Sequence, residues 1–325
     1  MTYQLVIDDE IRRQAELAIA QGRKLDLKND VVFKSFFSKD CEESAFCRRK
    51  LLSAVIGRVV KDTKVLNPEL PPQRIDGKFP RLDIHCVLED GSQVDVEIQN
   101  NMYEDDQIKR TIYYASALAH NSLSAGKPYA QLPQVYQIMF MDFIVTNDIR
   151  LHHSYTFRED KDYKQLSDIM QIHYIELPKL KNLVGKVMDD AVGKESVKPV
   201  RMLSELEFWS MMIIEGRDKN ARKKLAEFTG RNKEVLMADA LLDKMSLDRE
   251  EWERQLSYER FVHDCMSREA YAYMKGEEKG AQESTFEAVK SFYANGVSVD
   301  IIAKSLKMTV KQVKKIVSES LLQDA

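Results

Sequence analysis

The chain has 325 residues, of which 44% are hydrophobic and 31% are charged, and its formal net charge is −3. This length predicts two or three domains, and the composition is typical of a soluble globular protein with a sizeable core. The weakly acidic balance gives no overall support to nucleic-acid binding, so any basic surface must be local.

Cysteine usage and hydropathy exclude further classes. The four cysteines form no Cys-x-x-Cys pair and no zinc-like spacing, so we expect reduced thiols. The first residues contain no apolar signal-peptide core, and no apolar run approaches the length of a membrane span. We therefore expect an intracellular, cytoplasmic protein with no membrane partner.

The chain begins with predicted helices. Residues 7–22 predict a short helix that ends near Gly22. Asn29 is a suitable cap for a second helix, which carries Asp30 and Lys34 one turn apart on the same face. A third helix is predicted over about 43–61, and residues 62–80, with four of the eight prolines, predict a loop.

A predicted β-hairpin follows this loop. Residues 82–88 and 93–99 alternate between apolar and polar side chains, and the sequence Glu89-Asp90-Gly91-Ser92 between them is a turn signal. Acidic and amide groups stand among the apolar alternates, which is unusual for a purely structural hairpin. These groups are Asp83, Glu97 and Gln99.

The turn decides whether the two acids meet. A two-residue loop would pair Glu89 with Ser92 and leave Asp83 and Glu97 on opposite faces. A three-residue loop with Gly91 in the left-handed conformation would instead place Asp83 directly opposite Glu97, with Cβ atoms roughly 5 Å apart. We favour the second register because it also brings the apolar alternates together. Adjacent carboxylates need a cation or a shared proton between them, and a hard divalent metal, Mg²⁺ or Mn²⁺, suits them best.

The next elements complete an α/β pattern. A helix is predicted over about 104–124, with Ile108, Ile112, Ala115 and Ala119 on the sheet and Gln107, Arg110 and Tyr114 on a polar and aromatic face. The apolar run 134–145 predicts a central strand, and weaker strands are predicted at 152–158 and 171–177. The order of elements predicts a mixed sheet flanked by helices, in a domain that ends near residue 195.

The last third predicts helices only. A helix over 202–215 precedes a helical arm over 218–283 and three short helices over 285–293, 298–306 and 309–321. The last two helices match helix-turn-helix geometry, although a capping or oligomerising bundle is the competing interpretation. Residues 301–317 contain no acid and five lysines, which are Lys304, Lys307, Lys311, Lys314 and Lys315.

Taken together, these motifs resemble the PD-(D/E)XK nuclease superfamily, in which an Asp on one strand precedes Glu-x-Lys on the next. More closely, the chain resembles the Rpn branch, the recombination-promoting nucleases also called PD-(D/E)XK nuclease family transposases, in which Glu-Ile-Gln replaces Glu-x-Lys. The matching motifs, in chain order, are Asn29-Asp30-Val31-Val32-Phe33-Lys34, Leu82-Asp83-Ile84, Asp90-Gly91, Val96-Glu97-Ile98-Gln99, Lys109-Arg110, Tyr113-Tyr114-Ala115-Ser116, Gly126-Lys127-Pro128-Tyr129, Leu132-Pro133, Ile175-Glu176-Leu177-Pro178-Lys179 and Leu206-Glu207-Phe208-Trp209.

The resemblance implies a PD-(D/E)XK nuclease-like α/β fold with an all-helical C-terminal extension. It implies a metal-dependent DNA endonuclease, linked by the family name to recombination or mobile elements. Mg²⁺ or Mn²⁺ would be held by Asp83, Glu97 and the Ile98 carbonyl, next to the scissile phosphate. We expect the chain to have four parts: an N-terminal helix (1–24), the nuclease-like domain (25–195), a helical arm (196–283) and a helix-turn-helix-like tail (284–325).

The resemblance also assigns roles to neighbouring residues. Gln99 stands where the wider superfamily has lysine, and we expect Lys34 or Arg110 to supply the missing positive charge. Asp30 resembles an acid near the metal, with a helix cap or dipole partner as the alternative.

We expect DNA contacts from Lys34, Arg110, Tyr114, Lys311, Lys314 and Lys315, and self-association through the helical part. The competing hypothesis is a catalytically weak or inactive nuclease fold that binds DNA or protein, because Gln99 is neutral.

Overall fold

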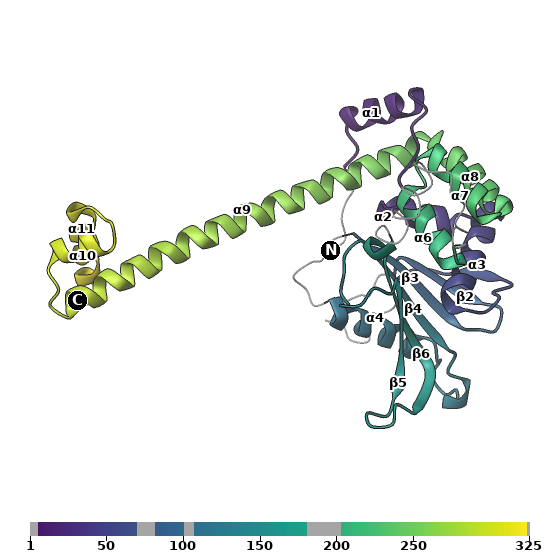
Figure 1. The fold of residues 1–325 in the computed structure, drawn as a ribbon, viewed down its shortest axis with the longest axis horizontal. Helices are drawn as coiled ribbons and strands as arrows, with labels where there is room; N and C mark the ends of the chain where they lie inside the picture. Colours follow the sequence, from purple (N-terminus) through teal and green to yellow (C-terminus); the bar gives the residue numbers. More distant parts are fainter. Residues whose placement is uncertain (1–5, 70–81, 101–106, 181–202, 324–325) are drawn as a thin grey trace, which may run out of the picture. The chain divides into compact units, whose positions relative to one another are not determined.

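The computed structural model describes residues 6–69, 82–100, 107–180 and 203–323 (Figure 1). The chain divides into two compact units, residues 1–258 and residues 259–325, each treated separately below. Residues 70–80 of the loop predicted over 62–80, and the predicted domain boundary near 195, lie outside the described residues. The first part of that loop prediction is wrong, because residues 63–65 form a strand that pairs with residues 86–88. None of the described helices combines the length and hydrophobicity needed to cross a bilayer.

A six-stranded mixed sheet forms the centre of the first unit, which confirms the predicted α/β fold. Its strand order is β1 (Thr63–Val65), β2 (Ile84–Leu88), β3 (Gln93–Gln99), β4 (Val135–Met141), β6 (Gln165–Glu176) and β5 (His152–Arg158). Strands β3, β4 and β6 are parallel, and the remaining pairs are antiparallel. All seven residues of β4 are buried, as its continuous apolar sequence predicts for a central strand.

The helices on the apolar side of the sheet are α1 (Asp9–Ala20), α2 (Asp30–Ser38), α3 (Glu42–Ile56), α6 (Glu205–Glu215), α7 (Lys219–Thr229) and α8 (Asn232–Ser246). Of these helices, α2 and α3 contact the strands of the sheet, and α6 and α8 pack on α3. Aromatic rings join α2 to the sheet and to α6, because Phe33 lies 6.0 Å from Phe140 and Phe37 lies 6.4 Å from Trp209 between ring centroids. These rings are fully buried, and each contributes roughly 2–3 kcal/mol through burial. This core therefore fixes the N-terminal end of α2 against the sheet.

Helix α4 (Gln107–Asn121) packs on β3, β4 and β6, on the opposite face of the sheet from this core. The prediction that Ile108 and Ile112 pack on the sheet is wrong, since both are 50% exposed. Gln107 and Thr111 are buried there instead. This face of the sheet is partly polar, because it carries the buried Asp95 and Gln137, and Leu118 and Ala117 of α4 pack on Val135 instead.

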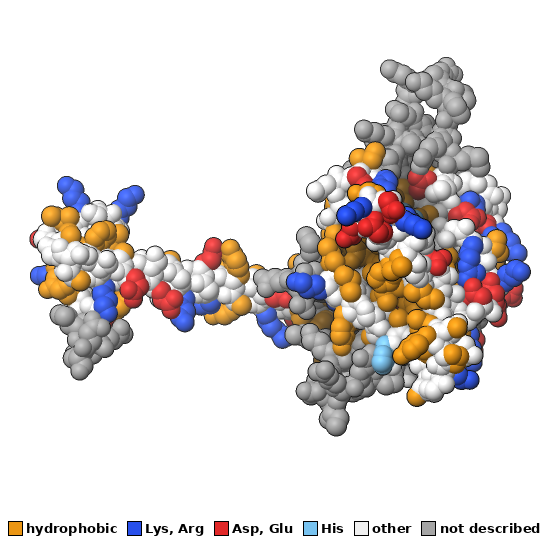
Figure 2. All heavy atoms as spheres, turned by 90° about the horizontal axis from the view of Figure 1, so that it is seen from below, with side chains coloured by type: hydrophobic (Ala, Val, Ile, Leu, Met, Phe, Trp, Pro, Cys, Tyr) orange, Lys and Arg blue, Asp and Glu red, His pale blue; other side chains and the backbone are white. Residues whose placement is uncertain are grey.

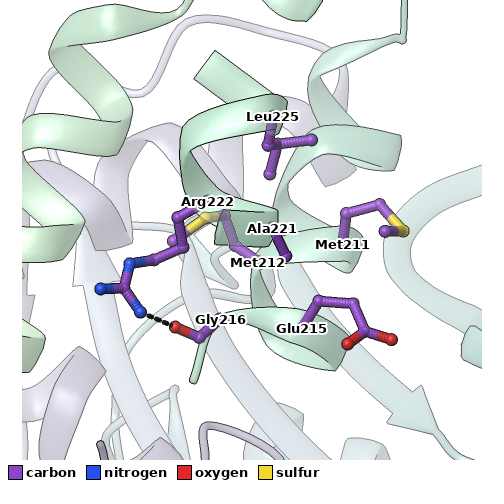
Figure 3. Close-up of a pocket in the computed structure, with 7 residues that line it drawn as sticks. All are labelled: Met211, Met212, Glu215, Gly216, Ala221, Arg222 and Leu225. Atoms are coloured by element: carbon purple, nitrogen blue, oxygen red, sulfur yellow. Dashed lines mark hydrogen bonds between the residues drawn. The ribbon is translucent and has the colours of Figure 1, made fainter. Parts of the chain in front are cut away.

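A small apolar hollow lies where α6 meets α7 (Figure 3). Arg222 donates a hydrogen bond to the Gly216 carbonyl there, joining the two helices. A Cβ at Gly216 would stand 2.1 Å from the Met212 carbonyl oxygen, so only glycine fits this connection. None of the predicted site residues lines this hollow, and we treat it as a packing defect.

The second unit contains most of α9 (Arg249–Ala294) together with α10 (Val299–Ser305) and α11 (Val310–Gln323). Helices predicted at 298–306 and 309–321 are confirmed by α10 and α11. The separate helix predicted over 285–293 is wrong, because these residues end the continuous α9. No proline interrupts α9, and its exposed Gly276 and Gly280 remain helical. The start of α9 belongs to the first unit, where Trp252 is fully buried.

Candidate active site

The hairpin between β2 and β3 has the three-residue loop that the sequence predicts. The Leu88 N–H donates to the Ser92 carbonyl at 2.9 Å, and the Gly91 N–H donates to the Leu88 carbonyl at 3.0 Å. Gly91 has φ of 86°, a left-handed conformation in which other residues are strained. The bulge of this loop therefore depends on glycine.

This loop sets the register of the two strands. Ile84 pairs with Val96, and the same register carried one residue further places Asp83 opposite Glu97. Leu88 and Ser92 form a hydrogen-bonded pair, so the alternation along the ladder makes Asp83 and Glu97 a non-hydrogen-bonded pair, in which side chains are closest. The predicted three-residue loop and its register are confirmed.

Glu97 is buried and Asp83 is largely buried. The side chain of Asp83 is 13% exposed and that of Glu97 is 3% exposed. Burial raises the pKa of Asp83 well above its usual value, and the negative charges of Asp30 and Glu97 add to the shift. Burial likewise raises the pKa of Glu97 well above its usual value, with Asp95 adding to it. Each acid therefore gains from a nearby cation.

Lysine 34 provides one such cation. Its Nζ lies 2.7 Å from Asp30 Oδ2 and 2.8 Å from Asp83 Oδ1, so it joins α2 to the start of β2. Asn29 caps α2 by accepting a hydrogen bond from the Val31 N–H at 3.1 Å, which leaves Asp30 available to hold Lys34. Asp30 thus pairs with Lys34 and also lies in the first turn of the helix, where a negative charge is favourable.

Arginine 110 lies on the other side of the acid pair. Its Nη2 is 3.9 Å from Glu97 Oε2, and its guanidinium lies 5.2 Å from the centre of the Tyr114 ring. Both side chains are partly exposed, and Tyr114 also packs against the small apolar cluster that contains Leu118 and Val135. The structure therefore brings Arg110 and Tyr114 to the hairpin acids from α4.

The end of β3 supplies the two remaining predicted residues. Gln99 is 8% exposed and shares the face of Glu97 through the two-residue period of the strand. The Ile98 N–H donates to Asp83 Oδ2 at 3.4 Å, beyond the point where β2 pairing ends. Because the N–H and C=O of one residue point to the same neighbour in an antiparallel strand, the Ile98 carbonyl is directed to the same side as Asp83.

Two further polar residues of this face were missed by the sequence reasoning. Asp95 is fully buried, and Gln137 of β4 donates from Nε2 to its Oδ2 at 2.6 Å. Burial raises the pKa of Asp95 to about 7, and the negative charge of Asp83 adds to the shift. Two signals could have found them. Asp95 shares the parity of Glu97, and Gln137 is a polar residue inside an apolar run.

The comparisons with known proteins decide the family. The model of the PD-(D/E)XK nuclease family transposases matches residues 27–272, which is most of the chain. The chain belongs to this family. Family membership gives it a nuclease or transposase-related role and agrees with the six-stranded mixed sheet. Neither the curated proteins nor the solved structures gave a significant match.

The sheet face that carries Glu97, together with α4 above it, contains several buried polar atoms without a hydrogen-bond partner. Such atoms are rare in folded proteins and indicate a missing partner such as water, an ion or a ligand. On β3, α4 and β4 these atoms are Asp95 Oδ1, Glu97 Oε1, Gln107 Nε2, Arg110 Nε and Gln137 Oε1. The neighbouring carboxyl groups of Asp95 and Glu97 each contribute one such oxygen, which a shared proton or a bound cation would satisfy.

The donor set fits a hard divalent cation. Within the described parts of the chain, no group of three or more His, Cys, Asp or Glu side chains has the arrangement of a metal site. Mg²⁺ commonly binds through only one or two carboxylates and keeps several waters, so Asp83, Glu97 and the Ile98 carbonyl form a sufficient set. The divalent metals typical of PD-(D/E)XK nucleases are therefore compatible with these residues.

The predicted lysines of the C-terminal tail lie in the second unit. Lys311, Lys314 and Lys315 are exposed on α11. They are therefore considered apart from this site.

Proposed function

We propose that this protein is a metal-dependent endonuclease that hydrolyses phosphodiester bonds of DNA at the Asp83–Glu97 pair. The observation that carries the proposal is the facing register of two buried carboxylates, one with an oxygen that lacks a hydrogen-bond partner. Solvated hairpin faces do not bury paired acids, because an uncompensated buried charge is costly. The family description names transposases, so we propose that this cleavage takes part in recombination or in the movement of mobile elements.

Asp83, Glu97 and the Ile98 carbonyl would hold Mg²⁺ or Mn²⁺. When bound, such a metal lowers the pKa of a water nucleophile and neutralises negative charge on the phosphate. Gln99 shares this face and can orient a water or a phosphoryl oxygen through its amide hydrogens. It cannot supply the positive charge of the lysine that the wider superfamily has at this position.

Lys34 is our candidate for that charge. Its Nζ lies 2.8 Å from Asp83 Oδ1 and 2.7 Å from Asp30 Oδ2, which holds it. A metal that takes over the charge of Asp83 would leave Lys34 able to contact a phosphate oxygen while Asp30 keeps it in position. Arg110, stacked on Tyr114, would contact the DNA from α4, and its exposure permits this.

The pairing of Lys34 also favours a second candidate function. Two carboxylates already engage this lysine and Gln99 is neutral, so the chain can instead be a weak or inactive nuclease fold that binds DNA or protein. Cleavage separates the two functions.

The test is nicking of supercoiled plasmid with Mg²⁺, with Mn²⁺, and with EDTA. Wild type should cleave only with metal, and Glu97→Gln or Asp83→Asn should lose more than about 100-fold in rate. Glu227→Gln, on the exposed face of α7 in the same unit, is the matched control and should cleave normally. Equal cleavage by Glu97→Gln and wild type would reject this site. Metal-independent DNA binding without cleavage would support the second function.

A further inference from the structure

The second unit ends in a three-helix cluster that lies beyond the family match, which stops at residue 272. The end of α9 packs with α10 and α11 (Figure 1) around an apolar core. The buried residues of this core are Val289, Ile302, Ala303, Val313 and Val317. The proposed nuclease function does not account for this cluster.

Hydrogen bonds and one left-handed residue fix the conformation of the connection between α10 and α11. The Leu306 N–H donates to the Ile302 carbonyl at 3.0 Å, and the Met308 N–H donates to the Ala303 carbonyl at 2.9 Å. Lys307 closes this helix end with φ of 52°, a left-handed conformation usually taken by glycine. Helix α10 ends at Ser305 and α11 begins at Val310, a connection as short as that of a helix-turn-helix, in which the second helix enters the major groove of DNA.

The start of α11 is also specified. The Thr309 N–H donates to Gln312 Oε1 at 2.9 Å, and the Gln312 N–H donates to Thr309 Oγ1 at 3.3 Å. This reciprocal pair is a capping box, which fixes the first turn of the helix. The side chains that follow on α11 are therefore presented from a rigid first turn.

The surface of this cluster is basic, although the whole chain has a net charge of −3. Residues 286–323 contain six lysines against three acidic residues. The helical period places Lys311, Lys314 and Lys315 on the face of α11 opposite the buried Val313 and Val317. These three lysines are exposed, as are Lys304 and Lys307 near the turn, and blue side chains extend from the cluster in Figure 2.

One acidic residue reduces the positive charge of this face, since Lys315 Nζ lies 3.7 Å from Glu319 Oε1. Both side chains are exposed, so this pair contributes little and can exchange for a phosphate contact. Basic residues on the outer face of the second helix are what phosphate binding requires.

We propose that α10 and α11 bind the phosphate backbone of duplex DNA through the face formed by Lys304, Lys307, Lys311, Lys314 and Lys315. This binding is independent of hydrolysis at the hairpin acids. It gives the chain a DNA-holding surface that the family match does not include. The partner is identified by its charge, because regularly spaced phosphates complement a cluster of exposed lysines on a rigid helix.

The test uses the full chain in EDTA, so that binding is measured without cleavage. Fluorescence anisotropy with a labelled DNA duplex, at several salt concentrations, gives the slope of log affinity against log salt. Replacing Lys311, Lys314 and Lys315 together by glutamine should reduce this slope by about 2 to 3, since each phosphate contact contributes about 0.9. At about 0.1 M salt, affinity should fall by roughly 10-fold or more.

The matched control replaces three exposed lysines of the first unit, Lys219, Lys223 and Lys224 on α7, by glutamine. It carries the same change of net charge and should keep the wild-type slope. An equal loss in both triple variants, or in neither, overturns the proposal.

Two further outcomes also reject it. A change of oligomeric mass with unchanged DNA affinity, measured by light scattering, would assign this face to self-association. A loss of affinity for duplex RNA alone would assign it to RNA. Failure of plasmid cleavage leaves this test intact, because no step of it requires the metal.

Discussion

Replacing Lys34 by methionine separates the two partners that the hairpin acids can take, the lysine and a metal. Lys34 Nζ contacts Asp30 at 2.7 Å and Asp83 at 2.8 Å, and these carboxylates are 9% and 13% exposed. Methionine keeps the length and apolar contacts of the lysine but removes its charge. Asp30 and Asp83 then face each other across the site without compensation.

The expected cost follows from burial. Removing one partner of a fully buried ion pair costs about 3–5 kcal/mol, and the 28% exposure of Lys34 reduces this to about 2–3 kcal/mol. Part of the cost is avoided when Asp83 takes up a proton, since burial already raises its pKa well above the usual value. A divalent cation should restore the loss, because ligand at 100 times its dissociation constant contributes about 2.7 kcal/mol.

Urea unfolding followed by tryptophan fluorescence measures this effect. The chain has two tryptophans, Trp209 and Trp252, and both are buried in the first unit. The signal therefore reports that unit alone, whatever the second unit does. Each variant is unfolded in EDTA and again in Mg²⁺. The pH is about 8, because carboxylates must be deprotonated to bind a metal.

Lys39→Met is the matched control. Lys39 Nζ lies 2.8 Å from Glu251, its side chain is 32% exposed, and its acid is 4% exposed. Removing the charge of Lys39 should also destabilise the unit. Mg²⁺ should restore little of that stability, because Glu251 lies on α9 and is not part of a facing pair of carboxylates such as Asp83 and Glu97. Equal recovery of Lys34→Met and Lys39→Met in Mg²⁺ would refute the assignment of the metal to the Asp83–Glu97 pair.

Three further predictions concern other residues. Burial raises the pKa of Asp95 to about 7, so the metal-free folded state holds a proton that the unfolded chain releases, and stability should fall by up to about 4 kcal/mol as pH rises from about 4 to about 7. Asp95→Asn should flatten this dependence in urea titrations, and an unchanged slope would contradict the assignment. Gly216→Ala should cost more than about 2 kcal/mol by tryptophan fluorescence, since its Cβ would meet the Met212 carbonyl. Lys307→Gly relieves a left-handed strain of about 1 kcal/mol, so amide exchange in α10 and α11 should slow while the salt slope of DNA binding falls by about 0.9. If Lys307→Gly raised or lowered DNA affinity and helix stability together, Lys307 would have no phosphate contact of its own.

The hairpin could be predicted from the sequence because its determinants are local. The alternation along 93–99 fixes one face, and Gly91 selects the three-residue loop that sets the register. Its two acids lie close in the chain relative to most tertiary pairs, so a single turn brings them together. The central strand β4 was predictable for a similar reason, because it is apolar on both faces.

Other features depend on contacts that no local pattern contains. The contact of Lys34 with Asp83 requires α2 to pack on the sheet, and that packing is set by the phenylalanine core. The orientation of α4 was mispredicted because apolar residues usually face a sheet, whereas this sheet face carries buried polar residues and Ile108 and Ile112 are exposed to solvent. Continuity of α9 through 285–293 was missed because local breaking signals are weaker than the cooperativity of a long helix.

Surface loops are ordinarily where insertions and deletions are tolerated. The turn at 89–91 is an exception, although it lies at the surface, where Arg58 pairs with Glu89 and Asp90. Deleting one of its residues favours a two-residue turn, which shifts one strand by a residue and directs Asp83 away from Glu97. Thirteen residues separate these acids, and that count is as necessary to the site as the carboxylates themselves. A length change here would leave every functional side chain present in the sequence and still dismantle the site.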